Sequence, residues 1–344
     1  MRFAPDMKLL VLGGTRYVGP AIVEAALAGR HTVTLFNRGK TNPELFPGVE
    51  KLRGDRDTKD LAALKGRTFD AVIDTYVEKP RLVREALEVV APNAGMWLFV
   101  SSVSVYADLS SSGVDETAPL QTEPLAPSAR SKDGDLEDVG AGYENFGPMK
   151  AACEKLVLER MKERGAVVRP HVIVGAGDRS DRLPYWIARV ADGGEVLAPE
   201  PRDQPVQFVD VRDLGAFVVK LVEDGHGGVY NVAGTRGCDT FEELLHAAKA
   251  ITGGAATFAW ARPEWLLEHE VAPWKDLPLW PPPGNEGVHV ISTAKARAHG
   301  FAPRAAGDTL RDVLAWERTR EANHAWRSGL TREREAELVR KLRS

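Results

Sequence analysis

The stretch that decides the fold reads Lys8-Leu-Leu-Val-Leu-Gly13-Gly14-Thr15-Arg16-Tyr17-Val18-Gly19. Its aliphatic start predicts a buried parallel strand, and the glycines that follow predict a tight turn. Apolar residues at 21–27 then predict a helix, and the run at 32–36 predicts a second strand. This order of strand, glycine turn, helix and strand is typical of the βαβ unit that binds dinucleotides.

The predicted turn has the chemistry of an anion site. Backbone amides at the start of the helix are free to bind an anion, and the helix dipole favours a pyrophosphate there. Gly13 permits a backbone conformation that other residues avoid, and Gly19 lets the helix approach the strand. The alternative is a loop that serves only as a tight turn. We expect these loop residues to bind the cofactor: Gly13, Thr15, Arg16, Tyr17, Val18 and Gly19.

Two positions bear on which cofactor is bound. Arg16 stands where the usual spacing places a glycine, so its side chain could lie beside the adenosine phosphate. NAD-binding chains usually carry Asp or Glu after the second strand, but this chain has Asn37 and Arg38. Two arginines without an acid tolerate or prefer a 2′-phosphate, which favours NADP over NAD. The alternative is that Arg38 is a solvated turn residue.

Strands and helices continue to alternate beyond this unit. Further strands are predicted at 49–53, 69–74, 95–100 and 167–170, with a helix at 80–90. The pattern predicts an α/β fold with a doubly wound parallel sheet and helices on both faces. Ligands bind beyond the carboxyl ends of such strands. The candidates at those ends are Asp55, Arg56, Asp74, Thr75, Ser101, Ser102 and Pro170, with Tyr76 as a substrate contact.

Length and composition set the wider limits. The 344 residues suggest about two domains: a cofactor domain over 1–175 that also draws elements from 205–235, and a substrate lobe over 176–344. The net charge of −4 argues against a nucleic-acid binder. Two cysteines and scattered histidines predict neither a disulfide framework nor a metal site. No apolar run is long enough for a membrane span or a secretion signal, so a cytoplasmic location is expected.

Five segments together resemble a known family. They are the loop at 13–19, Gly-Asp-Arg at 54–56, Ser-Ser-Val-Ser-Val-Tyr at 101–106, Lys150 with its helix, and Val-Asp-Val-Arg-Asp-Leu at 209–214. The chain resembles an extended or atypical short-chain dehydrogenase/reductase of the NAD(P)-dependent epimerase/dehydratase type. The resemblance implies that Asp55 hydrogen-bonds adenine, that Ser102 is the catalytic hydroxyl, and that Lys150 holds the nicotinamide ribose. It also implies a sugar or sugar-nucleotide substrate and a homodimer.

One residue departs from that family's central Tyr-x-x-x-Lys motif. The segment reads Tyr143-Glu-Asn-Phe-Gly-Pro-Met-Lys150, so Phe146 occupies the tyrosine position. A phenyl ring cannot transfer a proton. Three interpretations stay open: an engineered Tyr→Phe change that impairs the enzyme, a natural protein that uses another group such as Tyr143, or a protein that binds cofactor without turnover.

These observations lead to one expected activity and one alternative. The expected activity is NAD(P)-dependent hydride transfer at a carbinol or ketone of a small polar, sugar-like substrate, seen as net oxidation or reduction or as epimerisation. Arg179 and Arg182 are candidates for binding a substrate diphosphate, as is Arg212. The alternative is a non-catalytic NAD(P)-binding or RNA-associated protein, because the Gly-Gly-Thr-Arg loop is also similar to that of chloroplast stem-loop-binding proteins.

Overall fold

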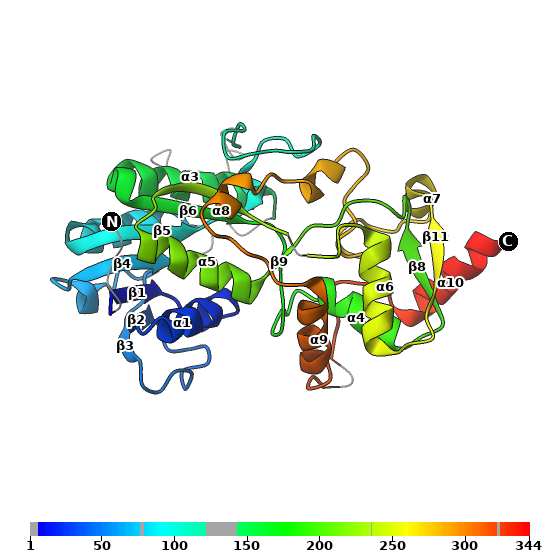
Figure 1. Cartoon of the computed structure of the whole chain (residues 1–344), viewed down its shortest axis with the longest axis horizontal. Helices are drawn as coiled ribbons and strands as arrows, with labels where there is room; N and C mark the ends of the chain where they lie inside the picture. The colour runs from blue at the N-terminus through cyan, green and yellow to red at the C-terminus, as the bar shows by residue number, and fades with distance from the viewer. Residues whose placement is uncertain (1–5, 76–78, 122–142, 235, 322–323) are drawn as a thin grey trace.

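The computed structural model describes residues 6–75, 79–121, 143–234, 236–321 and 324–344, and Figure 1 shows their arrangement. Its main feature is a seven-stranded sheet in the order β10-β6-β5-β4-β1-β2-β3, in which every neighbouring pair is parallel. The strands are β1 (Lys8–Leu12), β2 (Thr32–Asn37), β3 (Glu50–Arg53), β4 (Phe69–Asp74), β5 (Ala94–Val100), β6 (Gly165–Pro170) and β10 (Gly228–Val232). The predicted doubly wound α/β fold is confirmed.

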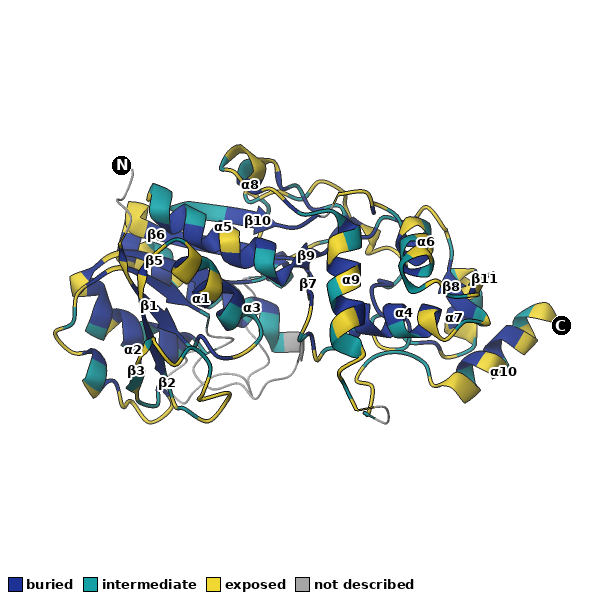
Figure 2. Ribbon diagram, turned by 60° about the horizontal axis from the view of Figure 1, so that its bottom comes forward, coloured by how far each residue is buried: buried dark blue, intermediate teal, exposed yellow. Residues whose placement is uncertain are grey.

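Helices cover both faces of this sheet because side chains alternate along each strand. Leu9 and Val11 of β1 pack in a core with α1 (Val18–Ala28) and α5 (Val211–Asp224). Leu10 and Leu12 point to the opposite face, which is covered by α2 (Pro80–Val90) and α3 (Tyr143–Met161). Figure 2 shows the strands of the sheet as buried between half-exposed helices.

A smaller lobe follows, drawn to the right in Figure 1. It contains a two-stranded parallel sheet of β8 (Glu195–Pro199) and β11 (Thr257–Ala261). Its apolar core also takes side chains from five helices. The helices of this part are α4 (Arg182–Ala191), α6 (Phe241–Thr252), α7 (Pro263–Glu268), α9 (Ala306–Glu317) and α10 (Arg332–Arg343).

Short elements join the two parts. The strands β7 (Ile173–Val174) and β9 (Val209–Asp210) pair in parallel. The chain also returns late to the large sheet, because α8 (Ala294–Ala298) packs against β10. The described 3-10 turns are η1 (Ala62–Leu64), η2 (Ala91–Asn93), η3 (Val103–Val105), η5 (Lys162–Arg164) and η6 (Glu286–His289). No described helix is both long enough and apolar enough to cross a bilayer.

Candidate functional site

A cavity of about 600 Å³ lies over the glycine loop, at the carboxyl ends of β1, β2 and β3. Most of the residues predicted to bind the cofactor line it: Gly13, Thr15, Arg16, Tyr17, Val18, Asn37, Arg38, Asp55, Arg56 and Thr75. Several other residues line the cavity without having been predicted to bind the cofactor, among them Gly14, Lys40, Thr41, Gly54 and Asp57. Lys40 and Thr41 follow Arg38 in the same loop, so their position after the second strand was the available signal.

Glycines let the loop pack tightly against its neighbours. Gly13 has a φ of 111°, and a Cβ atom there would lie 2.4 Å from Thr75 Oγ1. Thr75 Oγ1 in turn donates a hydrogen bond to Leu12 O at 2.8 Å, which ties the end of β4 to β1. A Cβ atom at Gly19 would lie 2.6 Å from Gly14 Cα, so only glycine lets α1 start this close to the turn. Gly13 therefore has the backbone conformation that the sequence predicted, whereas Gly19 gives α1 room against the turn at Gly14 and not against the strand.

Asn37 supports the loop. Its Nδ2 donates to Gly13 O at 2.8 Å, and its Oδ1 accepts from Gly39 N at 2.9 Å. Asn42 gives similar support, since its Nδ2 donates to Thr15 O at 3.0 Å. The polar groups of Asn37 thus hold two turns together, and Arg38 beside it lines the cavity.

The cavity wall carries charges of both signs. Arg38 is half exposed, and its Nη1 lies 3.9 Å from Asp55 Oδ2. A hydrogen bond from Lys79 lowers the pKa of the Asp57 carboxyl, and the Arg38 and Arg81 charges act in the same direction. Asp57 is therefore an anion at neutral pH. Arg16, Arg38 and Lys40 supply cationic groups around the same opening.

Phe146 and Lys150 form the second part of the predicted site, on α3. Lys150 is buried, and its Nζ donates to Val100 O at 2.7 Å. The same Nζ lies 4.6 Å from the centre of the Phe99 ring and 5.9 Å from that of Phe146. The side chain at 146 therefore stands beside the ammonium group, which is the arrangement a Tyr-x-x-x-Lys motif needs.

The end of β5 supplies the serines. Ser102 Oγ accepts from Ser104 N at 3.1 Å and lies 3.1 Å from Ser104 Oγ, to which it donates. Ser101 is buried, and its Oγ meets no hydrogen-bond partner within the described chain. Tyr76 lies outside the described residues, as does the side chain of Tyr143 at the start of α3. These two tyrosines therefore stay predictions.

The comparison with protein families decides the classification. The model of the NAD dependent epimerase/dehydratase family matches residues 9–233. The chain belongs to this family.

Relatives of this epimerase/dehydratase chain are distant. The chain is 26% identical over 263 residues to a chloroplast stem-loop binding protein of 41 kDa from Arabidopsis thaliana. The alignment covers 71% of this chain and 63% of that protein. The aligned chain therefore spans less than two thirds of that relative. It is 21% identical to the epimerase family protein SDR39U1 of Bos taurus, covering 73% of this chain and 82% of the relative.

Solved structures share its fold. A UDP-glucuronic acid 4-epimerase from Bacillus cereus in complex with NAD matches with a TM-score of 0.63 at 16% identity, covering 91% of this chain and 99% of that one. A putative epimerase from Burkholderia cenocepacia matches with a TM-score of 0.66 at 20% identity, covering 92% and 99%. At this identity the likeness establishes the architecture.

Asp74 forms a buried ion pair with Arg56. It is fully buried, and its carboxylate oxygens accept from Arg56 Nη1 at 2.9 Å and Nη2 at 3.1 Å. Arg56 Nη2 also donates to Leu82 O at 2.7 Å. Arg56 lines the cavity. Contact between Asp74 and the cofactor stays a prediction.

The remaining candidates lie nearer the second lobe. Pro170 ends β6 and is buried beside Val232 of β10. Arg179 is exposed, whereas Arg182 is the first residue of α4 and its Nε donates to Ser180 Oγ at 2.9 Å. The described cavity does not include these three residues.

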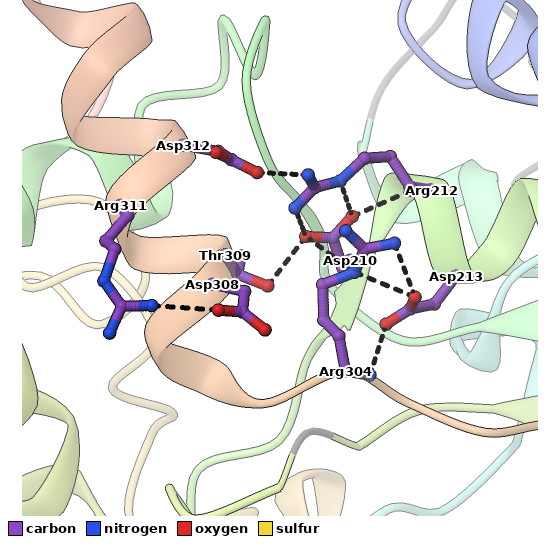
Figure 3. Close-up of polar contacts among 8 residues, drawn as sticks. All are labelled: Asp210, Arg212, Asp213, Arg304, Asp308, Thr309, Arg311 and Asp312. Atoms are coloured by element: carbon purple, nitrogen blue, oxygen red, sulfur yellow. Dashed lines mark hydrogen bonds and ion pairs between the residues drawn. The ribbon is translucent and has the colours of Figure 1, made fainter.

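Asp210 centres a charged network that joins α5 to α9 (Figure 3). Its carboxylate caps α5 by accepting from Arg212 N at 2.8 Å, and it also accepts from Thr309 Oγ1 at 2.7 Å. Arg212 Nη2 donates to Asp210 Oδ2 at 2.7 Å, and Arg212 also pairs with Asp312. Asp210 is therefore the N-cap of α5, and the charge of Arg212 is paired with the carboxylates of Asp210 and Asp312.

We predict that Asp210→Asn lowers the free energy of unfolding by about 1–3 kcal/mol at neutral pH, because buried charge-assisted hydrogen bonds are lost. Burial alone would raise the pKa of Asp210, but hydrogen bonds from Arg212 and Thr309 outweigh it and hold the pKa below its usual value. A lowered folded pKa adds stability above the unfolded pKa of about 3.9, and this contribution is lost as pH falls through the folded value.

Urea unfolding of both proteins between neutral and acidic pH measures this effect. The difference in midpoint should be largest near neutrality and should shrink below about pH 4, where Asp210 is protonated in the unfolded chain. A difference that stays constant down to acidic pH would contradict the assignment of the charge to Asp210.

Proposed function

We propose that the chain binds NADP in preference to NAD and uses it for hydride transfer at a carbinol or ketone carbon of a sugar-like substrate. The observation that carries the proposal is the cavity of about 600 Å³ over the glycine loop, with Arg38 on its wall. The loop can take its tight shape under this cavity because Gly13 and Gly19 carry no Cβ atoms, which would clash with Thr75 and Gly14. The basic groups Arg16, Arg38 and Lys40 favour the additional phosphate of NADP.

The chain's own residues have defined tasks in this proposal. Amides at the start of α1 bind the pyrophosphate. Lys150 holds the nicotinamide ribose, and the buried contact with Val100 O fixes its ammonium group at the end of β5. Ser102 hydrogen-bonds the reacting oxygen of the substrate. The bound nicotinamide supplies the hydride chemistry.

The substrate class proposed is a sugar nucleotide. It rests on family membership and on similar structures whose titles name UDP-sugars, such as the UDP-glucose 4-epimerase of Thermotoga maritima with UDP-glucose. Arg182 at the start of α4, with Arg179 nearby, provides positive charge that suits the diphosphate of such a substrate. Epimerisation and net redox chemistry are both compatible with these residues.

Calorimetric titration with NADP tests the cofactor site. We predict that Gly19→Ala weakens NADP binding by at least ~10-fold, because the added methyl group displaces the loop at Gly14. Gly48→Ala is the matched control, since a Cβ atom there meets nothing within 4 Å. Thermal unfolding shows whether both variants are folded. Equal NADP affinity in Gly19→Ala and wild type would contradict a cofactor site at this loop.

Arg38 tests the preference between the two cofactors. We predict that Arg38→Ala weakens NADP binding by about fivefold and leaves NAD binding unchanged, because an exposed arginine adds roughly 1 kcal/mol to phosphate binding. The control is Arg67→Ala, which removes a surface arginine paired with Glu50 outside this cavity. Parallel titrations with NADP and NAD measure the ratio of affinities. A loss that is equal for both cofactors would argue against 2′-phosphate recognition.

A second candidate function is binding without turnover, including association with RNA. Phe146 favours it, since the family's proton carrier is absent from that position. The name of the Arabidopsis relative, a stem-loop binding protein, points the same way. Salt-dependent retention on stem-loop RNA, together with no turnover of either cofactor, would support this function over the first.

A further inference from the structure

Strand β11 leaves one edge of the small sheet open. In the described chain this sheet has two strands, so β11 pairs with β8 along one edge and with no strand along the other. Figure 1 draws β11 beside β8 near the end of the smaller lobe. The strand reads Thr257-Phe-Ala-Trp-Ala261, without a charge or a proline. Proteins usually protect an exposed edge with such residues or with a covering element, because an open edge can pair with another chain.

The backbone of β11 shows which groups face the open edge. Thr257 N donates to Gly194 O at 2.8 Å, immediately before β8. Successive residues of a strand direct their N–H and C=O groups to opposite edges, so Ala259 also faces β8. Phe258 and Trp260 therefore face outward, and no hydrogen bond to their outward backbone groups exists among the described residues. These groups form an unused hydrogen-bonding ladder.

The side chains at this edge form an aromatic strip, Phe258 and Trp260. They are two residues apart, so they lie on one face of the sheet, with ring centres 6.1 Å apart. Both side chains are half-buried. His246 of α6 packs edge-on against Phe258 at 5.4 Å, and the guanidinium of Arg202 lies 5.2 Å from the centre of the Trp260 ring. The side chains of His246 and Arg202 are 59% and 55% exposed, so solvent reaches this strip.

The aromatic strip is complementary to itself under a two-fold axis. If a second β11 runs antiparallel with the axis at Ala259, Phe258 lies opposite Trp260 of the second copy, and Trp260 lies opposite its Phe258. Residues that lie opposite each other in this way exchange both N–H···O=C hydrogen bonds, so every outward group finds a partner. Opposite residues also share a face of the sheet, and aromatic cross-strand pairs stabilise it. A shift of the register by one residue would lose this match.

The charges around the aromatic strip fit the same arrangement. Arg202 Nη1 lies 3.7 Å from Glu242 Oε1, and that oxygen lies 3.8 Å from His246 Nε2. The cation thus stands at the Trp260 end of the strip, and the carboxylate lies between it and the histidine at the Phe258 end. Antiparallel pairing brings Trp260 of the second copy, with its arginine, to the Phe258 end of the first. Arg202 of each copy then approaches Glu242 of the other, so unlike charges meet on both sides of the axis.

We propose that β11 is an interface at which two copies of this chain pair antiparallel, giving a continuous sheet in the order β8-β11-β11-β8. A second copy is the occupant that supplies the complementary backbone edge, the aromatic partners and the opposite charges together. The two-fold axis closes both open edges, so association stops at the dimer. The interface lies in the smaller lobe and does not depend on the proposed cofactor or substrate.

Sedimentation velocity of the full chain over a range of concentrations tests this pairing. Wild type should form a dimer with a Kd on the order of 1–100 µM, because an interface built on one strand is small. Phe258→Lys and Trp260→Glu should each raise that Kd by at least ~10-fold, since each replaces an aromatic contact by a charge that faces a like charge, Arg202 or Glu242, of the second copy. The variant that combines both should associate like wild type, because the new ammonium and carboxylate lie opposite each other in the proposed register. Leu27→Glu is the control, since it charges an exposed apolar residue on α1.

Amide hydrogen exchange of the wild type is a second measurement, which needs no variant to fold. The Phe258 and Trp260 amides should be protected at high protein concentration and should exchange on dilution, whereas the Ala259 amide faces β8 and should stay protected throughout. The proposal is overturned if wild type is monomeric at about 1 mM, if folded single variants keep the wild-type Kd, or if the folded combined variant fails to recover association. Phe258 and Trp260 amides that exchange freely within the dimer would overturn it as well. Each of these results leaves the proposed cofactor site unaffected.

Discussion

Replacing Phe146 by tyrosine is expected to raise turnover of a sugar-nucleotide substrate by about 100- to 10,000-fold, the usual contribution of a positioned acid/base group. The ring at 146 already stands beside Lys150, with Nζ 5.9 Å from its centre. The positive charge of Lys150 would lower the pKa of a phenol there, so that it could exchange a proton with the substrate near neutral pH. The measurement is the steady-state rate, followed by nicotinamide absorbance and by separation of the sugar products.

Two controls make this result specific. Phe146→Leu also changes the ring but adds no hydroxyl group, so its rate should stay at the level of the starting chain. Phe146→Tyr combined with Lys150→Met should lose most of the gain, because the phenol keeps a high pKa without the ammonium. If the starting chain already turns over as fast as Phe146→Tyr, another group carries the proton, and Tyr143 becomes the next residue to replace.

The parts of the fold that could be predicted from sequence are those determined by residues close together in the chain. Gly13 has a positive φ, and Gly19 lies so close to Gly14 that a Cβ atom would clash. Glycine is the residue type that allows both, so glycine at these positions predicts the tight turn. The aliphatic runs around them predict buried parallel strands in the same direct way. The βαβ unit and most of the cofactor cavity followed from these signals.

The roles that could not be predicted depend on partners far away in the chain. Asp74 and Thr75 both follow a buried strand, yet Asp74 pairs with Arg56 while Thr75 lines the cavity. Side chains alternate along a strand, so a shift of one residue decides between the two positions.

The second large expected effect is a loss of stability on breaking a buried ion pair between α3 and β6. Glu154 and Arg169 have side chains that are 1% and 3% exposed. Arg169 Nε donates to Glu154 Oε1 at 3.0 Å, and its Nη1 donates to Tyr106 Oη at 3.0 Å. Glu154→Ala would leave the Arg169 charge buried without its counter-ion, at a cost of about 3–5 kcal/mol. Urea unfolding measures this loss.

The matched control for that substitution lies on the same helix. Glu159 faces Lys155 at 3.8 Å, but both side chains are mostly exposed. Solvent screens this pair, so Glu159→Ala should change the free energy of unfolding by less than about 0.5 kcal/mol. Equal unfolding midpoints for the two variants would show that Arg169 does not depend on Glu154, and would remove the buried pair as the support for this end of the strand.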